Sequence, residues 1–215
     1  MRIKFDAQLR LLGEEMTHMG SMIESAIQDA THAFLNQDVE TAKRIMAEDE
    51  YIDQEQKKIE NICFQLLIQQ QPVARDLRTI SSALKMISDL ERIGDQAADI
   101  ADLTRHVGLP NGSGMLHIAD MARAVIGMVT DSVDSFVKKD LDLARAVYAA
   151  DDQVDALFEQ VKQELIDMLA ADATYGEQGL DLLMVAKYLE RIGDHATNVA
   201  EWVEYSITGV HPSTN

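Results

Sequence analysis

Apolar side chains recur every three or four residues along most of the chain, which is the period of an amphipathic α-helix. The series in the first half runs through Leu9, Leu12, Met16, Met19, Ile23 and Ile27. A similar series in the second half runs through Leu116, Met121, Val125, Val129 and Phe136. No segment shows the sustained alternation of apolar and polar residues that is typical of a strand. The pattern therefore predicts an all-α protein.

Residues that interrupt helices are scarce and concentrated in one place. The chain of 215 residues has 11 glycines and 3 prolines, and one dense cluster of them spans residues 108–114. This cluster divides the chain into two halves, which we expect to be residues 1–107 and 115–208. Shorter breaks divide each half into three long helices, expected at about residues 6–36, 38–70, 72–107, 116–138, 140–171 and 177–207.

The two halves repeat one another. The hexapeptide LERIGD occurs at residues 90–95 and again at 189–194, a shift of 99 residues. Upstream of it, a shift of 102 residues superposes identical residues, including Phe34 on Phe136, Asp38 on Asp140, Asp49 on Asp151 and Asp53 on Asp155. A repeat of about 100 residues indicates a duplicated supersecondary unit. We therefore expect two tandem three-helix bundles that arose by internal duplication.

Each half carries two pairs of carboxylates spaced four residues apart, one pair on its second predicted helix and one on its third. The first set is Asp49, Asp53, Glu91 and Asp95, and the second is Asp151, Asp155, Glu190 and Asp194. Residues four apart share one face of a helix, so four carboxylates converge if the two helices turn these faces toward each other. Their mutual repulsion then favours a bound multivalent cation. The alternative interpretation is a solvated acidic surface.

The chemistry of these side chains limits the choice of metal. An all-oxygen ligand set suits Mg²⁺, Ca²⁺, Mn²⁺ or iron rather than a structural zinc held by Cys and His. Histidine ligands are few, because Glu15 and His18 form a single Glu-x-x-His motif of the ferritin type, without a counterpart in the other half. His195 directly follows the second LERIGD and is a candidate peripheral ligand, although Gln96 takes its place in the first half.

A glycine interrupts the acidic pair of the third helix in both halves. Gly94 and Gly193 each cost about 1 kcal/mol of helix stability relative to alanine. We therefore expect another element to approach the backbone closely at these positions. Close helix packing explains the two glycines by itself and is also compatible with a metal site above them.

The charge and composition of the chain exclude several classes of function. The formal net charge is −18, which repels nucleic acids and anionic membranes and favours metal cations and basic protein partners. No run of 18 apolar residues predicts a membrane-spanning helix, and the N-terminus has no apolar signal core. The single cysteine, Cys63, lies among apolar residues and is expected to be a packed, unreactive thiol. We predict a cytoplasmic protein, and the sequence shows no nucleophile motif or nucleotide-binding motif.

These features together resemble the PhoU family, the regulatory proteins of phosphate-specific transport in bacteria. The resemblance rests on the duplicated three-helix unit, on LERIGD in both third helices, and on the motif QPxxxDLR at residues 71–78. It covers residues 5–207. The second half lacks the QPxxxDLR motif in the corresponding region, residues 177–183. Partner contacts made through this motif would therefore be confined to the first half.

The resemblance implies a cytoplasmic regulator that is not an enzyme. This regulator links the ATPase of a phosphate ABC transporter to a membrane sensor histidine kinase. Such a regulator holds the phosphate-starvation response off and restrains phosphate uptake when phosphate is sufficient. It reaches the membrane only through its partners. Some family members bind iron or zinc clusters through paired (E/D)xxxD motifs, which here correspond to the eight carboxylates named above, and Mg²⁺ or Mn²⁺ is the alternative metal.

We further expect a homodimer. Two other function classes stay open on the residues alone. One is a carboxylate-bridged metalloenzyme, which would need an open metal position and a nearby base. The other is a helical scaffold that binds no metal.

Overall fold

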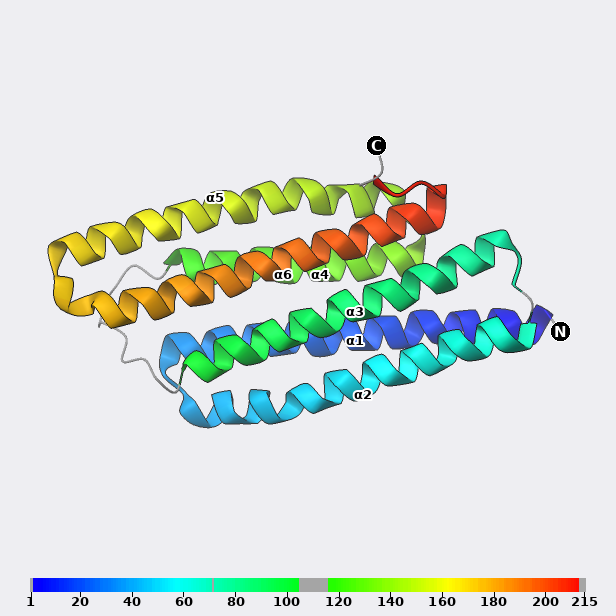
Figure 1. The fold of residues 1–215 in the computed structure, drawn as a ribbon, viewed down its shortest axis with the longest axis horizontal. Helices are drawn as coiled ribbons and strands as arrows, with labels where there is room; N and C mark the ends of the chain where they lie inside the picture. The colour runs from blue at the N-terminus through cyan, green and yellow to red at the C-terminus, as the bar shows by residue number, and fades with distance from the viewer. Residues whose placement is uncertain (1, 71, 105–115, 213–215) are drawn as a thin grey trace.

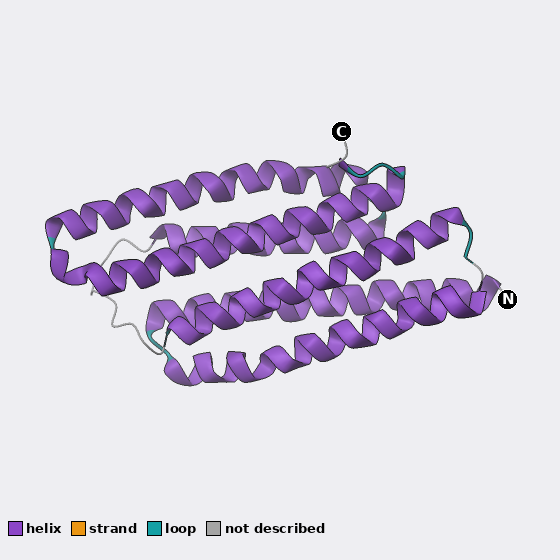
Figure 2. Cartoon of the chain, viewed as in Figure 1, coloured by secondary structure: helices purple, strands orange, loops and turns teal. Residues whose placement is uncertain are grey.

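The computed structural model describes residues 2–70, 72–104 and 116–212 (Figure 1). These residues form helices joined by short connections, and none of them lies in a strand (Figure 2). The elements are α1 (Arg2–Asn36), α2 (Val39–Gln70), α3 (Ala74–Leu103), α4 (Leu116–Lys138), α5 (Leu141–Ala171), the short 3₁₀-helix η1 (Ala173–Tyr175) and α6 (Gly176–Thr208). The prediction of an all-α protein with six long helices is confirmed.

Helices α1–α3 form one three-helix bundle and α4–α6 form the other (Figure 1). The bundles lie side by side, with α3 packed against α6 in the antiparallel direction and α1 packed against α4. A Cβ atom at Gly20 of α1 would lie only 3.3 Å from a methyl group of Val133, so α1 and α4 approach closely there. One hydrophobic core runs through both bundles. The expected boundary at residues 108–114 lies outside the described residues.

The turn between the first two helices of each bundle shows the duplication at atomic detail. Gln37 and Lys139, which correspond at a shift of 102 residues, both adopt a positive φ, 57° and 56°. The next residue is an aspartate in both cases. Asp38 Oδ1 accepts a hydrogen bond from the N–H of Thr41 at 3.1 Å, and Asp140 Oδ1 accepts one from Leu143 at 3.0 Å. Each aspartate therefore caps the helix that follows it.

The third helices begin differently from each other. We expected the first of them to start at Pro72, but α3 begins at Ala74, and Gln71 lies outside the described residues. Helix α6 follows the extra helix η1, where Asp172 accepts a hydrogen bond from the N–H of Thr174 at 2.9 Å. Helix α3 ends at Leu103, and the expected end near residue 107 lies outside the described residues.

The core is aliphatic, as the low aromatic content implies. Its largest fully buried side chains are mainly Leu, Ile and Met, with Phe34 as the aromatic exception. Cys63 is fully buried in this core, and its burial raises the pKa of its thiol to about 12. A thiol with such a pKa is almost entirely protonated at neutral pH. The prediction of an unreactive, packed cysteine therefore agrees with the structure.

Candidate functional site: two acidic clusters

The structure brings together the four carboxylates that the sequence singled out in the first bundle. We call Asp49 and Asp53 of α2 with Glu91 and Asp95 of α3 the first acidic cluster. Burial raises the pKa of Glu91, and the neighbouring carboxylates of Asp95, Asp53 and Asp49 raise it further. The pKa of Asp95 is raised by burial and by Asp53. The α2 pair and the α3 pair therefore face each other closely enough to repel.

Asp49 has the largest pKa shift in this cluster. Burial and, after it, the negative charges of Asp95, Asp53 and Asp99 together raise its pKa to about 6. Asp99 lies one helical turn beyond Asp95 on α3 and was not among the predicted ligands. Its own pKa is raised by burial and by Asp95. The first acidic cluster therefore extends to a fifth carboxylate.

The second bundle repeats the arrangement between α5 and α6. We call Asp151, Asp155, Glu190 and Asp194 the second acidic cluster. Burial raises the pKa of Asp151 to about 6, with contributions from Asp155, Asp194 and Glu190. The pKa of Asp194 is raised by burial and then by Glu190. The same electrostatic strain thus occurs in both copies of the duplicated unit.

The second acidic cluster contains a lysine ammonium group that the sequence analysis missed and that has no counterpart in the sequence of the first. Lys187 of α6 places its Nζ 2.6 Å from Glu190 Oε1 and 5.6 Å from the ring centre of Phe158. The residue that corresponds to Lys187 in the first bundle, at a shift of 99 residues, is Ser88. Comparing the residues that flank the two LERIGD copies would have revealed this difference. An ammonium group therefore neutralises part of the second cluster, whereas serine offers no charge beside the first.

The two glycines lie where the α2 and α5 side chains press against the third helices. A Cβ atom at Gly94 would lie 3.0 Å from Ile52 Cδ1 and 3.5 Å from Asp49 Oδ1. A Cβ atom at Gly193 would lie 3.2 Å from Asp151 Oδ1. The expectation of a close approach at these glycines is therefore met. Each glycine leaves room for the equivalent aspartate of its own bundle.

The donor set fits a hard cation in chemistry but not yet in geometry. All eight predicted ligands are carboxylates, the ligand type that such cations prefer. Within the described residues, however, no three Asp, Glu, His or Cys side chains converge on one point that could hold a metal ion. Metal ligation by the two clusters stays a prediction, and it would require the carboxylates to rotate toward a shared ion.

Of the two histidines considered as ligands, His195 makes a contact with the other bundle. His195 Nδ1 lies 2.9 Å from Asp89 Oδ1 of α3, and the side-chain amide of Asn198 donates to the same oxygen at 3.3 Å. These contacts join α6 to α3 across the two bundles. Glu15 is bonded to Lys58 of α2, so the Glu-x-x-His motif it forms with His18 is not an isolated ligand pair. Sequence spacing alone gave no sign of these contacts between helices.

A family model and curated relatives match this chain over most of its length. The PhoU domain family model matches residues 16–104 and 118–203, one match in each bundle. The chain is 40% identical over 213 residues to the phosphate-specific transport system accessory protein PhoU homolog of Clostridium acetobutylicum, covering 98% of this chain and 97% of that protein. It is 31% identical over 211 residues to the accessory protein PhoU of Escherichia coli K12, covering 96% and 86%.

Solved structures agree with these matches. The crystal structure of PhoU from Pseudomonas aeruginosa superposes with a TM-score of 0.87 at 33% identity, covering 96% of this chain and all of that one. The crystal structure of the phosphate transport system regulatory protein PhoU from Streptococcus pneumoniae gives a TM-score of 0.88 at 28% identity, covering 96% and 98%. Among the residues described for this chain, no helix has both the length and the hydrophobicity needed to span a bilayer.

Proposed function

The chain belongs to the PhoU family, and from this membership we propose that it is a cytoplasmic negative regulator of phosphate uptake and of the phosphate-starvation response. The observation that carries the proposal is the match of the family model to both bundles. The relatives named above are accessory proteins of phosphate-specific transport, and the similar Streptococcus structure is described as a regulatory protein of that system. The proposed role is regulatory rather than enzymatic.

The regulator would act as an adaptor between the ATPase of a phosphate ABC transporter and a sensor histidine kinase. Its net charge of −18 supports this role, because basic patches on either partner would complement the acidic surface and speed the encounter. Association with the membrane would then occur only through these partners. A homodimer is the proposed form in solution.

The two acidic clusters are the proposed cation sites of this regulator. The support is electrostatic: burial and mutual repulsion raise the pKa of Asp49 and of Asp151 to about 6 in the absence of a cation. A bound ion would supply positive charge to both pairs and would draw the facing helices together through their carboxylates. Iron or zinc is the proposed metal, with Mg²⁺ or Mn²⁺ as the alternative. Metal occupancy would then tune docking to the partners.

Deletion of the gene in the source bacterium tests the regulatory role. We expect phosphate-starvation genes to become active in phosphate-rich medium and a plasmid copy to restore repression. Measurement of a phosphate-controlled reporter enzyme gives the result. Repression that persists without the protein would refute the proposal.

Elemental analysis of the purified protein tests the metal proposal. We expect bound metal in the wild type, with losses in the Glu91→Gln and Glu190→Gln variants. Metal that neither substitution alters would contradict ligation by the clusters, and absence of metal would favour the scaffold. Turnover of a phosphoester or reduction of oxygen by the metal-loaded protein would instead favour the enzyme.

A further inference from the structure

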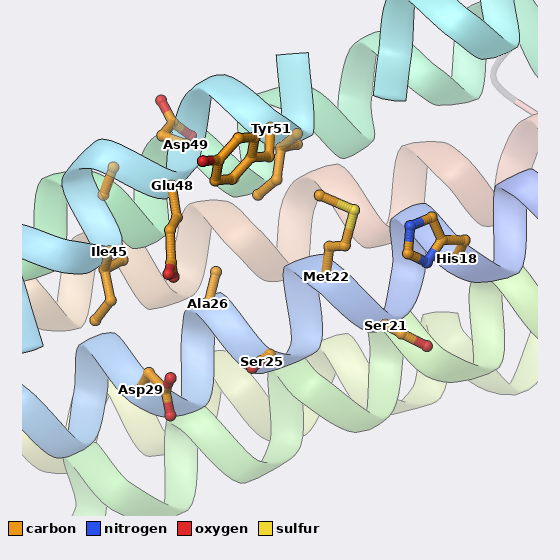
Figure 3. Close-up of a pocket in the computed structure, with 13 residues that line it drawn as sticks. His18, Ser21, Met22, Ser25, Ala26, Asp29, Ile45, Glu48, Asp49 and Tyr51 are labelled. Atoms are coloured by element: carbon orange, nitrogen blue, oxygen red, sulfur yellow. The ribbon is translucent and has the colours of Figure 1, made fainter. Parts of the chain in front are cut away.

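A cavity of about 330 Å³ opens between α1 and α2 in the first bundle (Figure 3). Helices α1 and α2 form its sides, and Gly94 and Ala98 of α3 also line it. The apolar part of its lining comes mainly from Met22, Ala26, Ile45 and Ile52. This volume is at the lower end of the range for ligand sites, and it is enough for one long side chain.

Ala26 is one of the positions lining the cavity at which the duplicated bundles differ in side-chain size. At a shift of 102 residues the counterpart of Ala26 is Met128, which is buried in the second bundle. Its terminal methyl group lies 3.7 Å from the position of a Cβ atom at Gly193, which is the counterpart of Gly94. In the second bundle a methionine thus extends toward the third helix, whereas Ala26 leaves the corresponding space open. Figure 3 shows Ala26 pointing into the gap between the helices.

Carboxylates dominate the polar part of the lining. Asp29 of α1 and Glu48 of α2 are bridged by Arg44, whose two terminal nitrogens lie 2.9 and 2.7 Å from them. Asp49 also lines the cavity, and within the described residues it makes no hydrogen bond or ion pair. Three carboxylates therefore line the cavity, and two of them are already paired with Arg44. A ligand with an apolar stem and a cationic head fits this environment, and an anion does not.

The mouth of the cavity carries an exposed aromatic ring. Tyr51 is 59% exposed and lies on α2 near Glu48 (Figure 3). A guanidinium group can stack on such a ring and can bond a carboxylate through two parallel N–H groups. Its aliphatic stem would pack on Met22, Ile45 and Ile52. Arginine and tyrosine are also the residue types that contribute most at protein interfaces.

We propose that this cavity is a docking pocket for an arginine side chain of a basic protein partner. The proposal rests on the proposed adaptor function, because that function supplies a partner. It assigns docking to the first bundle at this pocket, since the second bundle fills the equivalent space with its own methionine.

Two variants isolate the pocket. Ala26→Met places into the cavity the side chain that the second bundle already uses, so it should fold and should block the pocket. Ala7→Met is the matched control, because it makes the same change at an exposed position of the same helix. Tyr51→Ala is a second test that leaves the core untouched, since Tyr51 is mostly exposed. Thermal unfolding of each variant verifies that it is folded.

The first measurement uses the blocked peptide acetyl-Gly-Arg-Gly-amide and NMR spectra of the full chain. We expect shifts at the amides of Ala26, Gly94 and Ala98 that saturate with peptide. The same peptide with citrulline in place of arginine should give none, because citrulline lacks the charge. Loss of the shifts in Ala26→Met and their persistence in Ala7→Met would support the proposal. Equal shifts with citrulline, equal shifts in Ala26→Met, or no shifts at these amides would overturn it.

The second measurement uses the purified phosphate-transporter ATPase and the kinase of the source bacterium. We expect Ala26→Met to bind one of them at least about tenfold more weakly than the wild type and Ala7→Met do. Wild-type binding that Ala26→Met leaves unchanged would refute the pocket while the adaptor function stands. Failure of the wild type to bind either partner would refute the adaptor function, and the peptide experiment would then decide the pocket alone.

Discussion

Substitution of the two LERIGD glycines by alanine should change stability in opposite directions, although the local sequences are identical. Alanine at either position gains about 1 kcal/mol of helix propensity. The new methyl group meets a different neighbour in each bundle. At Gly94 it would lie 3.0 Å from Ile52 Cδ1 and 3.1 Å from Ile52 Cγ2, whereas at Gly193 its nearest neighbour is Asp151 Oδ1 at 3.2 Å.

The magnitude follows from how easily each neighbour can move. Ile52 is only 4% exposed and is branched at Cβ, so its Cγ2 methyl cannot retreat without a change of the whole side chain. Overpacking of this kind costs about 1–3 kcal/mol, which exceeds the gain from propensity. We therefore expect Gly94→Ala to destabilise the protein by about 1 kcal/mol. The Asp151 carboxylate is the end of a side chain and can rotate away, so Gly193→Ala should stabilise by up to about 1 kcal/mol.

Urea denaturation followed by circular dichroism, with a chelator present, measures both free energies of unfolding. For a chain of this size, a difference of about 1 kcal/mol also shifts the melting temperature by about 2–4 °C. If Gly94→Ala stabilises the protein as much as Gly193→Ala does, the contact with Ile52 is not rigid. The close-approach explanation of Gly94 would then be wrong.

Four further predictions follow from the same contacts. Because the pKa of Asp49 and of Asp151 is raised to about 6 in the folded state, their stabilisation is complete below the unfolded value of 3.8 and is lost as pH rises through about 6. The metal-free protein should therefore melt higher at about pH 5 than at about pH 7, and a double aspartate-to-asparagine variant at these positions should show a flatter dependence. Met128→Ala should destabilise the protein by about 2–5 kcal/mol, because it opens in the second bundle a cavity like that of the first. Ala26→Met should stabilise the protein by about 0.5–2 kcal/mol, because it fills the cavity of the first bundle. Chemical denaturation measures both changes, and changes of the same sign would refute the packing difference between the two bundles. Cys63 should react with a thiol reagent only after unfolding, since burial raises its pKa to about 12, and rapid labelling of the native protein would contradict this. Lys187→Ser should raise the metal affinity of the second acidic cluster in calorimetric titration, because a bound cation no longer competes with the Lys187 ammonium group for Glu190. An unchanged affinity would show that this ion pair does not oppose metal binding.

Much of the fold was predictable from local patterns. The apolar period gave six helices whose described ends lie within a few residues of the expected ones, because each helix buries one continuous stripe. Alignment of the halves placed Asp38 on Asp140, and the structure shows both aspartates capping the helix that follows. The spacing of four residues showed that each carboxylate pair shares one face of its helix, but whether the α2 and α3 faces meet depended on the packing of the two helices.

Other features of the site depended on contacts between segments distant in sequence. The ion pair of Lys187 with Glu190 was readable from spacing, yet its position over Phe158 depends on how α6 packs against α5. The contact of His195 with Asp89 joins residues that are 106 positions apart, and sequence spacing carries no information about it. The candidate ligand His195 is thus also part of the contact between the bundles.

By itself the sequence determined the helices, the duplication, the carboxylate pairs on each helix and the family. These properties are local or periodic, since a helix forms between near neighbours and a duplication repeats the same neighbours. The tertiary structure decided which groups surround the corresponding positions of the repeat. Ile52 lies against Gly94, Asp151 lies against Gly193, and open space lies beside Ala26. Identical hexapeptides thus acquire different surroundings, because side-chain packing depends on the residues that other helices contribute.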